Sequence, residues 1–334
     1  MPALRLLVAL ALAWLAAPAL AQTPGKPVLD TVVVAGWSQP ISEITNLLAE
    51  PDHGLFKARG IALDYVPGNG GGSAIQALLA GQADVAFTDP ASFYLALDKG
   101  ADLVAIYDIY PQNVFNVVSP KDRGIRSVAD LKGKRVGVYS LASGTRQHLL
   151  LLLAAAGLKE SDVTVEVTGL LNFAPLIQGQ VDATAATDTG LLVGRAKGLG
   201  EVDVIDVRDH LNLPSDIFVV TRKDYEARKP LLRRFLAAYR DSAAWMIAKP
   251  DEAARLAVTR AINGRDEAIN REVIRLRNLS SVSAATEREG LGHFEPGIMQ
   301  KGADLFRTLG LVSRPLDMDK VVRSDLLPAK EGTP

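Results

Sequence analysis

The sequence predicts an α/β protein of two similar lobes, each built on a mostly parallel sheet that is flanked by helices. Short apolar, β-branched runs alternate with helical segments, which is the pattern of parallel β-α-β units. The stretch LLAGQADVAFTD at 78–89 is echoed by LIQGQVDATAATD at 176–188, about one domain's length further along the chain. Two other apolar runs, at 114–120 and 216–224, flank the second unit.

The first unit is predicted to begin with a buried strand close to the N-terminus. Apolar, β-branched runs mark its strands, and Gly81 and Gly100 end two of its helices. The predicted strands are 28–37, 61–66, 83–88 and 103–110, and the predicted helices are 41–49, 73–79 and 90–100.

The second unit repeats this order after a connecting segment that ends at Gly133. The predicted strands are 134–140, 163–168, 181–187 and 201–207, and the predicted helices are 143–158, 172–180 and 189–200. From Tyr225 onward the pattern is mostly helical, with Leu232, Leu236 and Tyr239 on one apolar face.

The two apolar runs that flank the second unit predict the domain organisation. If both are strands that pass between the lobes, the second unit is inserted into a first lobe that the C-terminal helices complete. We therefore expect lobe 1 at 28–116 and 217–334, and lobe 2 at 117–216. A cleft between the lobes and a two-strand hinge follow from this arrangement.

Residues 1–21 are predicted to be a signal peptide that is removed from the mature protein. Arg5 stands in a short basic start, an apolar run extends from Leu6 to Leu15, and the small residues Ala19 and Ala21 precede Gln22. The apolar run is too short for a membrane span. Because no Cys follows, we expect an exported protein without a lipid anchor.

Composition excludes several classes of function. The chain of 334 residues has no Cys, which removes disulfides, iron–sulfur clusters and Cys nucleophiles. The 37 basic and 38 acidic residues give a net charge of −1, which argues against a nucleic-acid partner. The four His show no metal-ligand spacing, and no nucleophile or phosphate-binding motif occurs. We expect no catalytic residues, no metal and no cofactor.

Three stretches carry a family resemblance. GLFKARG at 54–60, Gly-Gln-x-Asp at 81–84 and SVADLKGKRVGV at 127–138 resemble the periplasmic substrate-binding proteins of ABC importers. The similarity covers about 28–248 and is greatest to the branch for nitrate, sulfonates, taurine and thiamine pyrimidines. The resemblance implies the two-lobed type II periplasmic-binding-protein fold. It also implies a periplasmic monomer with a small-molecule ligand and an inner-membrane ABC permease as partner.

The candidate binding residues stand in the loops that follow the predicted strands. Ligands of open parallel sheets lie beyond the carboxyl ends of the strands, where loops lead into helix N-termini. The predicted ligand-binding residues are Trp37, Ser38, Gly70, Gly71, Ser73, Thr88, Asp89, Tyr110, Asn113, Ser143, Gly144, Thr145, Thr187 and Asp188.

Each of these loops also has a structural interpretation. Trp37 can stack on a planar ligand or cover the edge of the core. The glycines before Ser73 can bind an anion through backbone N–H groups or form a plain tight turn. Ser143 can help bind an anion or cap its helix, and both can hold at once. Asp89 and Asp188 can cap helices or contact an amine.

The functional expectation is a solute-binding protein that closes at its hinge on a small polar organic solute and delivers it to the permease. The loops at Gly70 and Ser143 favour an organic anion such as a sulfonate or carboxylate. Trp37 and Tyr110 support a pyrimidine-type or flavin-type heteroaromatic as the alternative. No Arg or Lys can be placed in the cleft, although Arg146 adjoins one loop. An exported enzyme and a ligand sensor on the same fold remain open.

Overall fold

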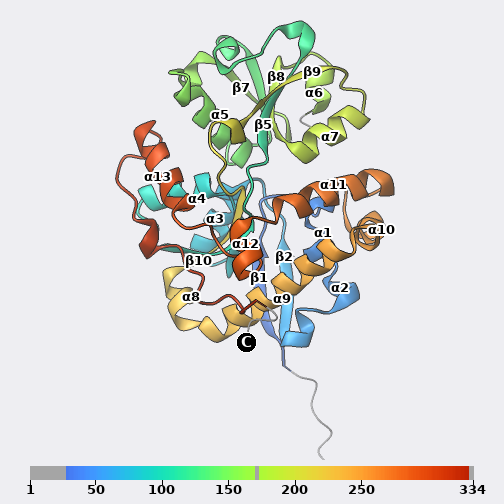
Figure 1. The fold of residues 1–334 in the computed structure, drawn as a ribbon, viewed down its shortest axis with the longest axis vertical. Helices are drawn as coiled ribbons and strands as arrows, with labels where there is room; N and C mark the ends of the chain where they lie inside the picture. Colours follow the sequence, from blue (N-terminus) through green and yellow to red (C-terminus); the bar gives the residue numbers. More distant parts are fainter. Residues whose placement is uncertain (1–27, 170–172, 331–334) are drawn as a thin grey trace, which may run out of the picture.

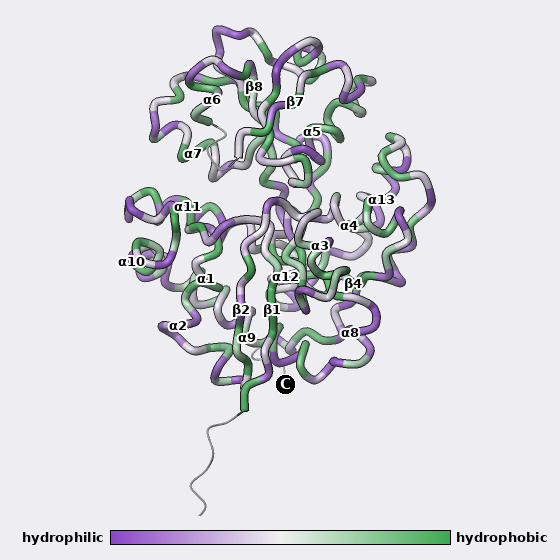
Figure 2. The backbone as a smooth tube through the Cα atoms, turned by 180° about the vertical axis from the view of Figure 1, so that it is seen from behind, coloured by the Kyte–Doolittle hydropathy of each residue, from purple (hydrophilic) through white to green (hydrophobic). Residues whose placement is uncertain are grey.

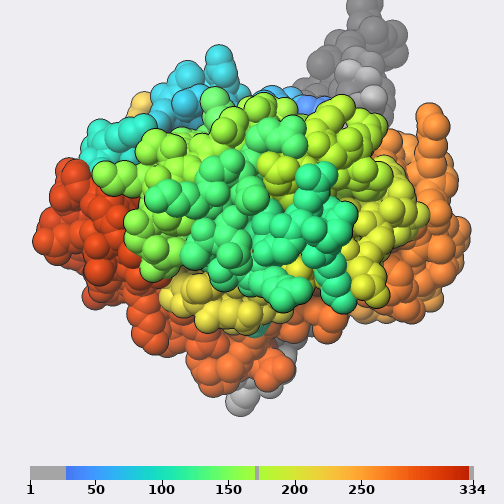
Figure 3. Space-filling view, turned by 90° about the horizontal axis from the view of Figure 1, so that it is seen from above, coloured from blue at the N-terminus to red at the C-terminus, as the bar shows by residue number. Residues whose placement is uncertain are grey.

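The computed structural model describes residues 28–169 and 173–330, which form two α/β lobes (Figure 1). The predicted signal peptide, residues 1–21, lies outside the described residues. In the part of the chain that is described, no helix combines the length and the apolar character needed to cross a membrane. Seen from above, the second lobe covers the middle of the first, and C-terminal segments extend beyond it on both sides (Figure 3).

The first lobe contains a five-stranded sheet. Its strands are β1 (Asp30–Ala35), β2 (Ile61–Val66), β3 (Val85–Thr88), β4 (Leu103–Tyr110) and β10 (Asp216–Thr221). Their order is β2-β1-β3-β10-β4. β10 is antiparallel to both neighbours, whereas β1 is parallel to β2 and to β3. The interior strand β1 is apolar over most of its length (Figure 2), as its predicted burial requires.

The second lobe repeats this topology. Its strands are β5 (Phe115–Pro120), β6 (Arg135–Val138), β7 (Thr164–Val167), β8 (Ala183–Thr187) and β9 (Val202–Asp206). Their order is β7-β6-β8-β5-β9, and β5 is the antiparallel strand. In each sheet the antiparallel strand is therefore the one that the chain enters on crossing from the other sheet. The division into lobes at 116 and 216 itself stays a prediction.

Helices flank both sheets, and those that follow β10 pack on the first lobe (Figure 1). The α-helices are α1 (Thr45–Leu48), α2 (Glu50–His53), α3 (Gly71–Leu79), α4 (Pro90–Asp98), α5 (Gly144–Ala155), α6 (Phe173–Ile177), α7 (Asp188–Ala196), α8 (Arg222–Ala227), α9 (Lys229–Ala248), α10 (Pro250–Arg260), α11 (Glu267–Ser280), α12 (Ala284–Glu289) and α13 (Ile298–Thr308). Single 3-10 turns lie at Ser42–Ile44 (η1), Lys57–Arg59, Lys121–Arg123, Val128–Leu131, Glu160–Asp162, Val207–Asp209 and Met318–Lys320.

The apolar face predicted for the long C-terminal helix is confirmed. Leu232, Leu236 and Tyr239 of α9 are buried against one face of the first sheet. The ring of Phe218, on β10, packs edge-on against the ring of Tyr239 with centroids 4.6 Å apart. Strand β10, which arrives after the second lobe, is thus held by the helix that follows it. The strand within the apolar run at 216–224 ends at Thr221, whose side chain caps α8.

The echoed stretches form the same local structure in both lobes. Gly81 and Gly179 end their helices with positive φ values of 70° and 71°, a conformation that glycine adopts without steric cost. One carboxylate oxygen of Asp84 accepts a 2.8 Å hydrogen bond from the N–H of Val33 in β1. The carboxylate of Asp182 accepts one of 2.9 Å from the N–H of Arg135 in β6. Each Asp thereby joins the start of one parallel strand to its neighbour.

The two crossing segments are hydrogen-bonded to each other between the sheets. The hydroxyl of Ser215 donates to the carbonyl oxygen of Gln112 at 2.6 Å and accepts from the N–H of Val114 at 3.0 Å. The N–H of Asn113 donates to the side-chain oxygen of Asn212 at 2.8 Å. These bonds tie the predicted hinge segments into one connection.

Asp182→Ala is expected to lower the free energy of unfolding by about 1–3 kcal/mol at neutral pH, because it leaves a strand N–H without its charged acceptor. The hydrogen bond from Arg135 lowers the pKa of Asp182. A lowered pKa in the folded state stabilises the fold at pH values above the pKa of the unfolded chain, which is about 4. This stabilisation is lost as the pH falls through the pKa of the folded state. Urea unfolding at pH 7 and pH 3 should therefore show a penalty at pH 7 that shrinks at pH 3. The exposed Asp122→Ala serves as control, and equal midpoints for both variants at pH 7 would contradict the role of Asp182.

Candidate functional site

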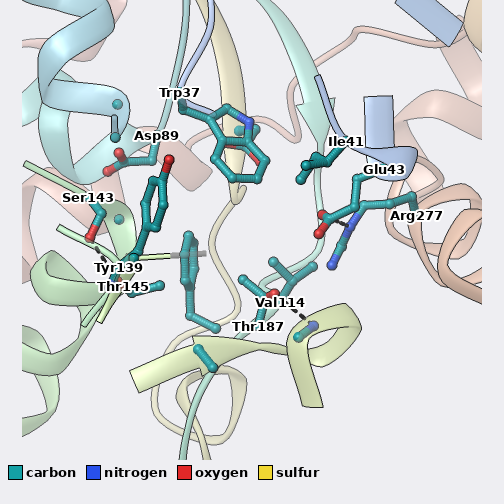
Figure 4. A pocket seen from close by; sticks show the side chains of 18 residues that line it. Trp37, Ile41, Glu43, Asp89, Val114, Tyr139, Ser143, Thr145, Thr187 and Arg277 are labelled. Atoms are coloured by element: carbon teal, nitrogen blue, oxygen red, sulfur yellow. Dashed lines mark hydrogen bonds and ion pairs between the residues drawn. The ribbon is translucent and has the colours of Figure 1, made fainter. Parts of the chain in front are cut away.

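A cavity lies between the two sheets, at the edge where the parallel strands end (Figure 4). Eight of the fourteen predicted residues line it, namely Trp37, Gly70, Gly71, Asp89, Ser143, Gly144, Thr145 and Thr187. The remaining lining residues are Ile41, Glu43, Val114, Phe115, Tyr139, Gly169, Ala186, Gly190, Asp216 and Arg277. Both lobes contribute, so the cavity exists only while they face each other.

Three aromatic rings form much of the cavity wall. Trp37 follows β1, Tyr139 follows β6 and Phe115 begins β5. The ring of Trp37 lines the cavity and also packs edge-on against the core residue Phe87, so both interpretations of this residue hold structurally. The ring of Phe115 stacks on that of His148, with centroids 3.9 Å apart. Burial lowers the pKa of His148 to about 4, which leaves this imidazole neutral and suited to packing.

Two buried carboxylates face the cavity from the side of the first sheet. Asp89 caps α4 by accepting hydrogen bonds of 2.8 and 2.7 Å from the N–H and the hydroxyl of Ser92. Asp216 is the first residue of β10, and no described residue donates a hydrogen bond to its carboxylate. Burial raises the pKa of both carboxyl groups, and the charge of Asp89 adds to the effect at Asp216. Asp216 therefore lacks a hydrogen-bond donor among the described residues, whereas Asp89 has two from Ser92.

On one flank of the cavity an arginine joins the lobes (Figure 4). Arg277 of α11 is 1% exposed and bonds the carboxylate of Glu43 in η1 at 2.7 Å. It also pairs with the carboxylate of Asp188, which begins α7 in the second lobe. The hydroxyl of Thr189 donates to Glu43 at 2.7 Å. Burial opposes the charge of Arg277, but Asp188 and Glu43 outweigh burial and raise the pKa of the guanidinium.

On the other flank the glycine-rich loop meets the loop after β6. The N–H of Gly72 donates to the carbonyl oxygen of Ala142 at 3.0 Å. The hydroxyl of Ser140 donates to the carbonyl oxygen of Asn69 at 2.6 Å. Gly70 has a φ of 112°, and a Cβ there would lie 2.5 Å from the oxygen of Ala142. The glycines thus permit a close approach of the lobes. Contacts on both flanks make this the closed arrangement.

At the N-terminus of α5, the side chains of the loop cap the helix, as one of the two interpretations predicts. The hydroxyl of Ser143 lies 2.7 Å from that of Thr145, and it donates to the carbonyl oxygen of Ser140 at 2.7 Å. The hydroxyl of Thr145 accepts from the N–H of Tyr139 at 3.1 Å. Only the first backbone N–H groups of α5 remain for a ligand. Arg146, which adjoins this loop, pairs with Glu160 at 2.7 Å and does not line the cavity.

The other six predicted residues do not line the cavity. They are Ser38, Ser73, Thr88, Tyr110, Asn113 and Asp188. Most are used in local contacts: the hydroxyl of Thr88 donates to Gly71 at 2.9 Å, and the side chain of Asn113 accepts from the N–H of Phe115 at 3.0 Å. Tyr110 packs beneath the guanidinium of Arg277, with 5.4 Å between ring centroid and Cζ. A ligand-binding role for the fourteen residues stays a prediction.

No sequence pattern pointed to Glu43 or Arg277, because both come from helices rather than from loops after strands. Asp216 and Phe115 could have been found. Each begins the antiparallel strand of its sheet, and such a strand starts at the edge where its parallel neighbours end. Tyr139 directly follows a parallel strand, so the rule used for Trp37 applies to it as well.

Gly70→Ala is expected to hinder closure, because the added methyl group would collide with the backbone of Ala142. The matched control is Gly100→Ala, which has a positive φ of 92° but no neighbour within 4 Å. Both changes should cost about 1–3 kcal/mol of stability through the unfavourable backbone conformation. Small-angle X-ray scattering should show a larger radius of gyration for Gly70→Ala alone. Identical scattering from the two variants would contradict the close-approach role.

Comparison with known proteins agrees with this architecture. The chain is 26% identical over 322 residues to the riboflavin-binding protein RibY of Chloroflexus aurantiacus, covering 94% of this chain and 91% of that protein. The alkanesulfonate-binding protein SsuA of Xanthomonas axonopodis pv. citri, solved with MOPS, has the same fold. The TM-score between the two structures is 0.70 at 20% sequence identity, and the match covers 90% of this chain and 99% of the Xanthomonas chain.

The periplasmic aliphatic sulphonate-binding protein SsuA of Escherichia coli also shares the fold, with a TM-score of 0.63 at 22% identity. The match covers 87% of this chain and 97% of the Escherichia coli chain. These structures confirm the predicted two-lobed periplasmic-binding-protein fold. The family model described as NMT1/THI5 like matches residues 41–253. The chain therefore belongs to the NMT1/THI5-like family of binding proteins.

Proposed function

We propose that this protein is the periplasmic solute-binding component of an ABC-type importer and that it captures a planar heteroaromatic solute that donates hydrogen bonds. The observation that carries this proposal is the pair of buried carboxylates, Asp89 and Asp216, beside the aromatic rings of the cavity. The partner is an inner-membrane permease that receives the solute.

The wall of the cavity supports a ring-shaped ligand. Trp37, Phe115 and Tyr139 present aromatic surface, on which a planar heterocycle can stack. The related protein of Chloroflexus aurantiacus is named for riboflavin, which is a solute of this kind.

The charges of the cavity support hydrogen-bond donors on that ligand. Asp216 has no donor among the described residues, and the oxygens of Asp89 retain acceptor capacity beyond the bonds from Ser92. An amino group or a ring N–H of a heterocycle would meet this need. Arg277 offers little to an anion, because Glu43 and Asp188 already neutralise it.

An organic anion is the second candidate. It is favoured by the first backbone N–H groups of α5, at Gly144 and Thr145, which adjoin the cavity at the positive end of the helix dipole. The sequence ranked this class first. The four carboxylates of Glu43, Asp89, Asp188 and Asp216, in or beside the cavity, reverse that order.

Capture is proposed to work by closure of the lobes. A ligand that touches Trp37 and Asp89 in one lobe and Tyr139 in the other has more contacts in the closed state than in the open one. It therefore shifts the equilibrium by its difference in affinity for the two states. The closed form is the one presented to the permease.

Calorimetric titration of the mature protein with riboflavin, thiamine, cytosine and ethanesulfonate tests the ligand class. We expect at least one heteroaromatic to bind, and Trp37→Ala to weaken it by about 1–3 kcal/mol, the usual loss of an aromatic stacking partner. Trp245→Ala is the matched control, because Trp245 lies on α9 outside the cavity. Binding of ethanesulfonate alone would overturn the heteroaromatic class. If no solute of any class binds or co-purifies, the solute-binding proposal itself fails.

Asp216→Asn is expected to raise the melting temperature of the ligand-free protein at pH 7.5, by about 2–4 °C for each kcal/mol gained. Burial raises the pKa of Asp216, so the folded state binds more protons than the unfolded state and loses stability as the pH rises above about 4. Scanning fluorimetry from pH 3.5 to 8 should show the gain at high pH and its disappearance near pH 4. A gain that is independent of pH would contradict a buried, unpaired carboxylate.

A further inference from the structure

Arg277 is the one Arg or Lys among the described residues that line the cavity. Its side chain comes from α11 of the first lobe and is 1% exposed. A buried guanidinium beside a ligand cavity is, by its charge and its planar fork of donors, suited to binding a carboxylate or sulfonate. The groups that already accept hydrogen bonds from Arg277 therefore decide whether it can also bind a solute anion.

The donors of Arg277 are nearly all used within the protein. Its Nε donates to the carboxylate of Glu43 at 2.7 Å, and its Nη1 donates to the hydroxyl of Ser280 at 3.3 Å. Its Nη2 donates to the carboxylate of Asp188 and to the hydroxyl of Thr189, the latter at 3.0 Å. Since a guanidinium has five N–H groups, one is left for a solute.

The charge of the cluster is also unfavourable for an anion. Glu43 and Asp188 place two negative charges on one positive guanidinium. Asp89 and Asp216 add acidic groups to the lining of the same cavity. A solute anion at Arg277 would meet the negative charges of Glu43 and Asp188 in a buried environment, where like charges repel strongly.

Asp188 is held in place for this contact by the crossing segment before β5 and by its own helix. As first residue of α7, it donates its N–H to the carbonyl oxygen of Val114 at 3.0 Å. Its carboxylate accepts from the N–H of Thr189 at 2.7 Å. Arg277 and Glu43 belong to the first lobe, so the contact forms only when the lobes close. A solute anion on Arg277 would have to displace Asp188 and thereby remove this closing contact.

We propose that Asp188 is a specificity-determining residue, an internal anion that occupies the guanidinium of Arg277 and excludes anionic solutes from the closed cleft. The proposal rests on the proposed solute-binding function and adds the reason why an uncharged or hydrogen-bond-donating solute is selected. An anion opposes closure because it competes with Asp188. A solute without negative charge leaves the contact between the lobes intact.

The test is a gain of anion binding in Asp188→Asn, which keeps the shape of the side chain and removes its charge. The probe is ethanesulfonate, titrated by calorimetry into wild type and variant. We expect at least tenfold tighter binding by Asp188→Asn than by wild type. The double variant Asp188→Asn, Arg277→Gln should lose this gain, since the anion would sit on the guanidinium. Asp209→Asn, an exposed site in the second lobe, removes the same charge and should gain nothing.

Two results would overturn the proposal. One is that wild type binds ethanesulfonate as tightly as Asp188→Asn. The other is that Asp188→Asn and a second variant, Asp188→Ser, melt cooperatively as folded proteins yet gain no binding. Failure of the proposed ligand class looks different: no heteroaromatic binds to wild type, while the gain of ethanesulfonate binding in Asp188→Asn remains. Control of anion entry by Asp188 would then stand without the heteroaromatic ligand.

Discussion

The antiparallel strand in each sheet is the constraint on which the rest of the structure depends. β10 completes the first sheet after the chain has built the second, and β5 enters the second sheet directly from the first. Because each runs against its parallel neighbours, it starts at the edge where they end. The crossing segments, the cavity, and the first residues Phe115 and Asp216 therefore meet at one edge. A site between lobes follows from this chain path before any side chain is specified.

Under the proposed function, the charges at that edge determine which ligand a repeated scaffold selects. Removing a guanidinium from water is costly, and a buried ion pair contributes little net stability against an apolar replacement. The Glu43–Arg277–Asp188 cluster is therefore weak as a stability device, although losing one partner would be severe. The cluster spans the two lobes, so the contact that forms on closure is also the one that we propose to exclude anions from Arg277. Asp89 and Asp216 impose a matching demand, since buried carboxylates without enough donors favour a solute that supplies them.

Sequence reasoning reached the scaffold because its signals are local. The glycines that end helices, such as Gly81, and the alternation of strands and helices depend on neighbouring residues alone. The rule that loops after parallel strands face the ligand likewise placed Trp37 and Asp89 at the cavity. It missed the cluster around Arg277, because Glu43 and Arg277 are 234 residues apart in the chain and meet only through the packing of α11 on η1. No pattern in either segment encodes that contact.

The echoed Thr-Asp pairs show how near-identical pieces acquire different roles. In the first lobe Pro90 follows Asp89 and occupies the first helical position, so Asp89 becomes the cap of α4 and its carboxylate turns to the cavity. In the second lobe no proline follows, the helix begins one residue earlier relative to the pair, and Thr187 is the cap. Asp188 then projects from the first turn of α7 toward α11, a helix that only the C-terminal segment supplies. One proline and one added helix thus convert a repeated structural element into a carboxylate that lines the cavity in one lobe and a carboxylate that pairs across the lobes in the other.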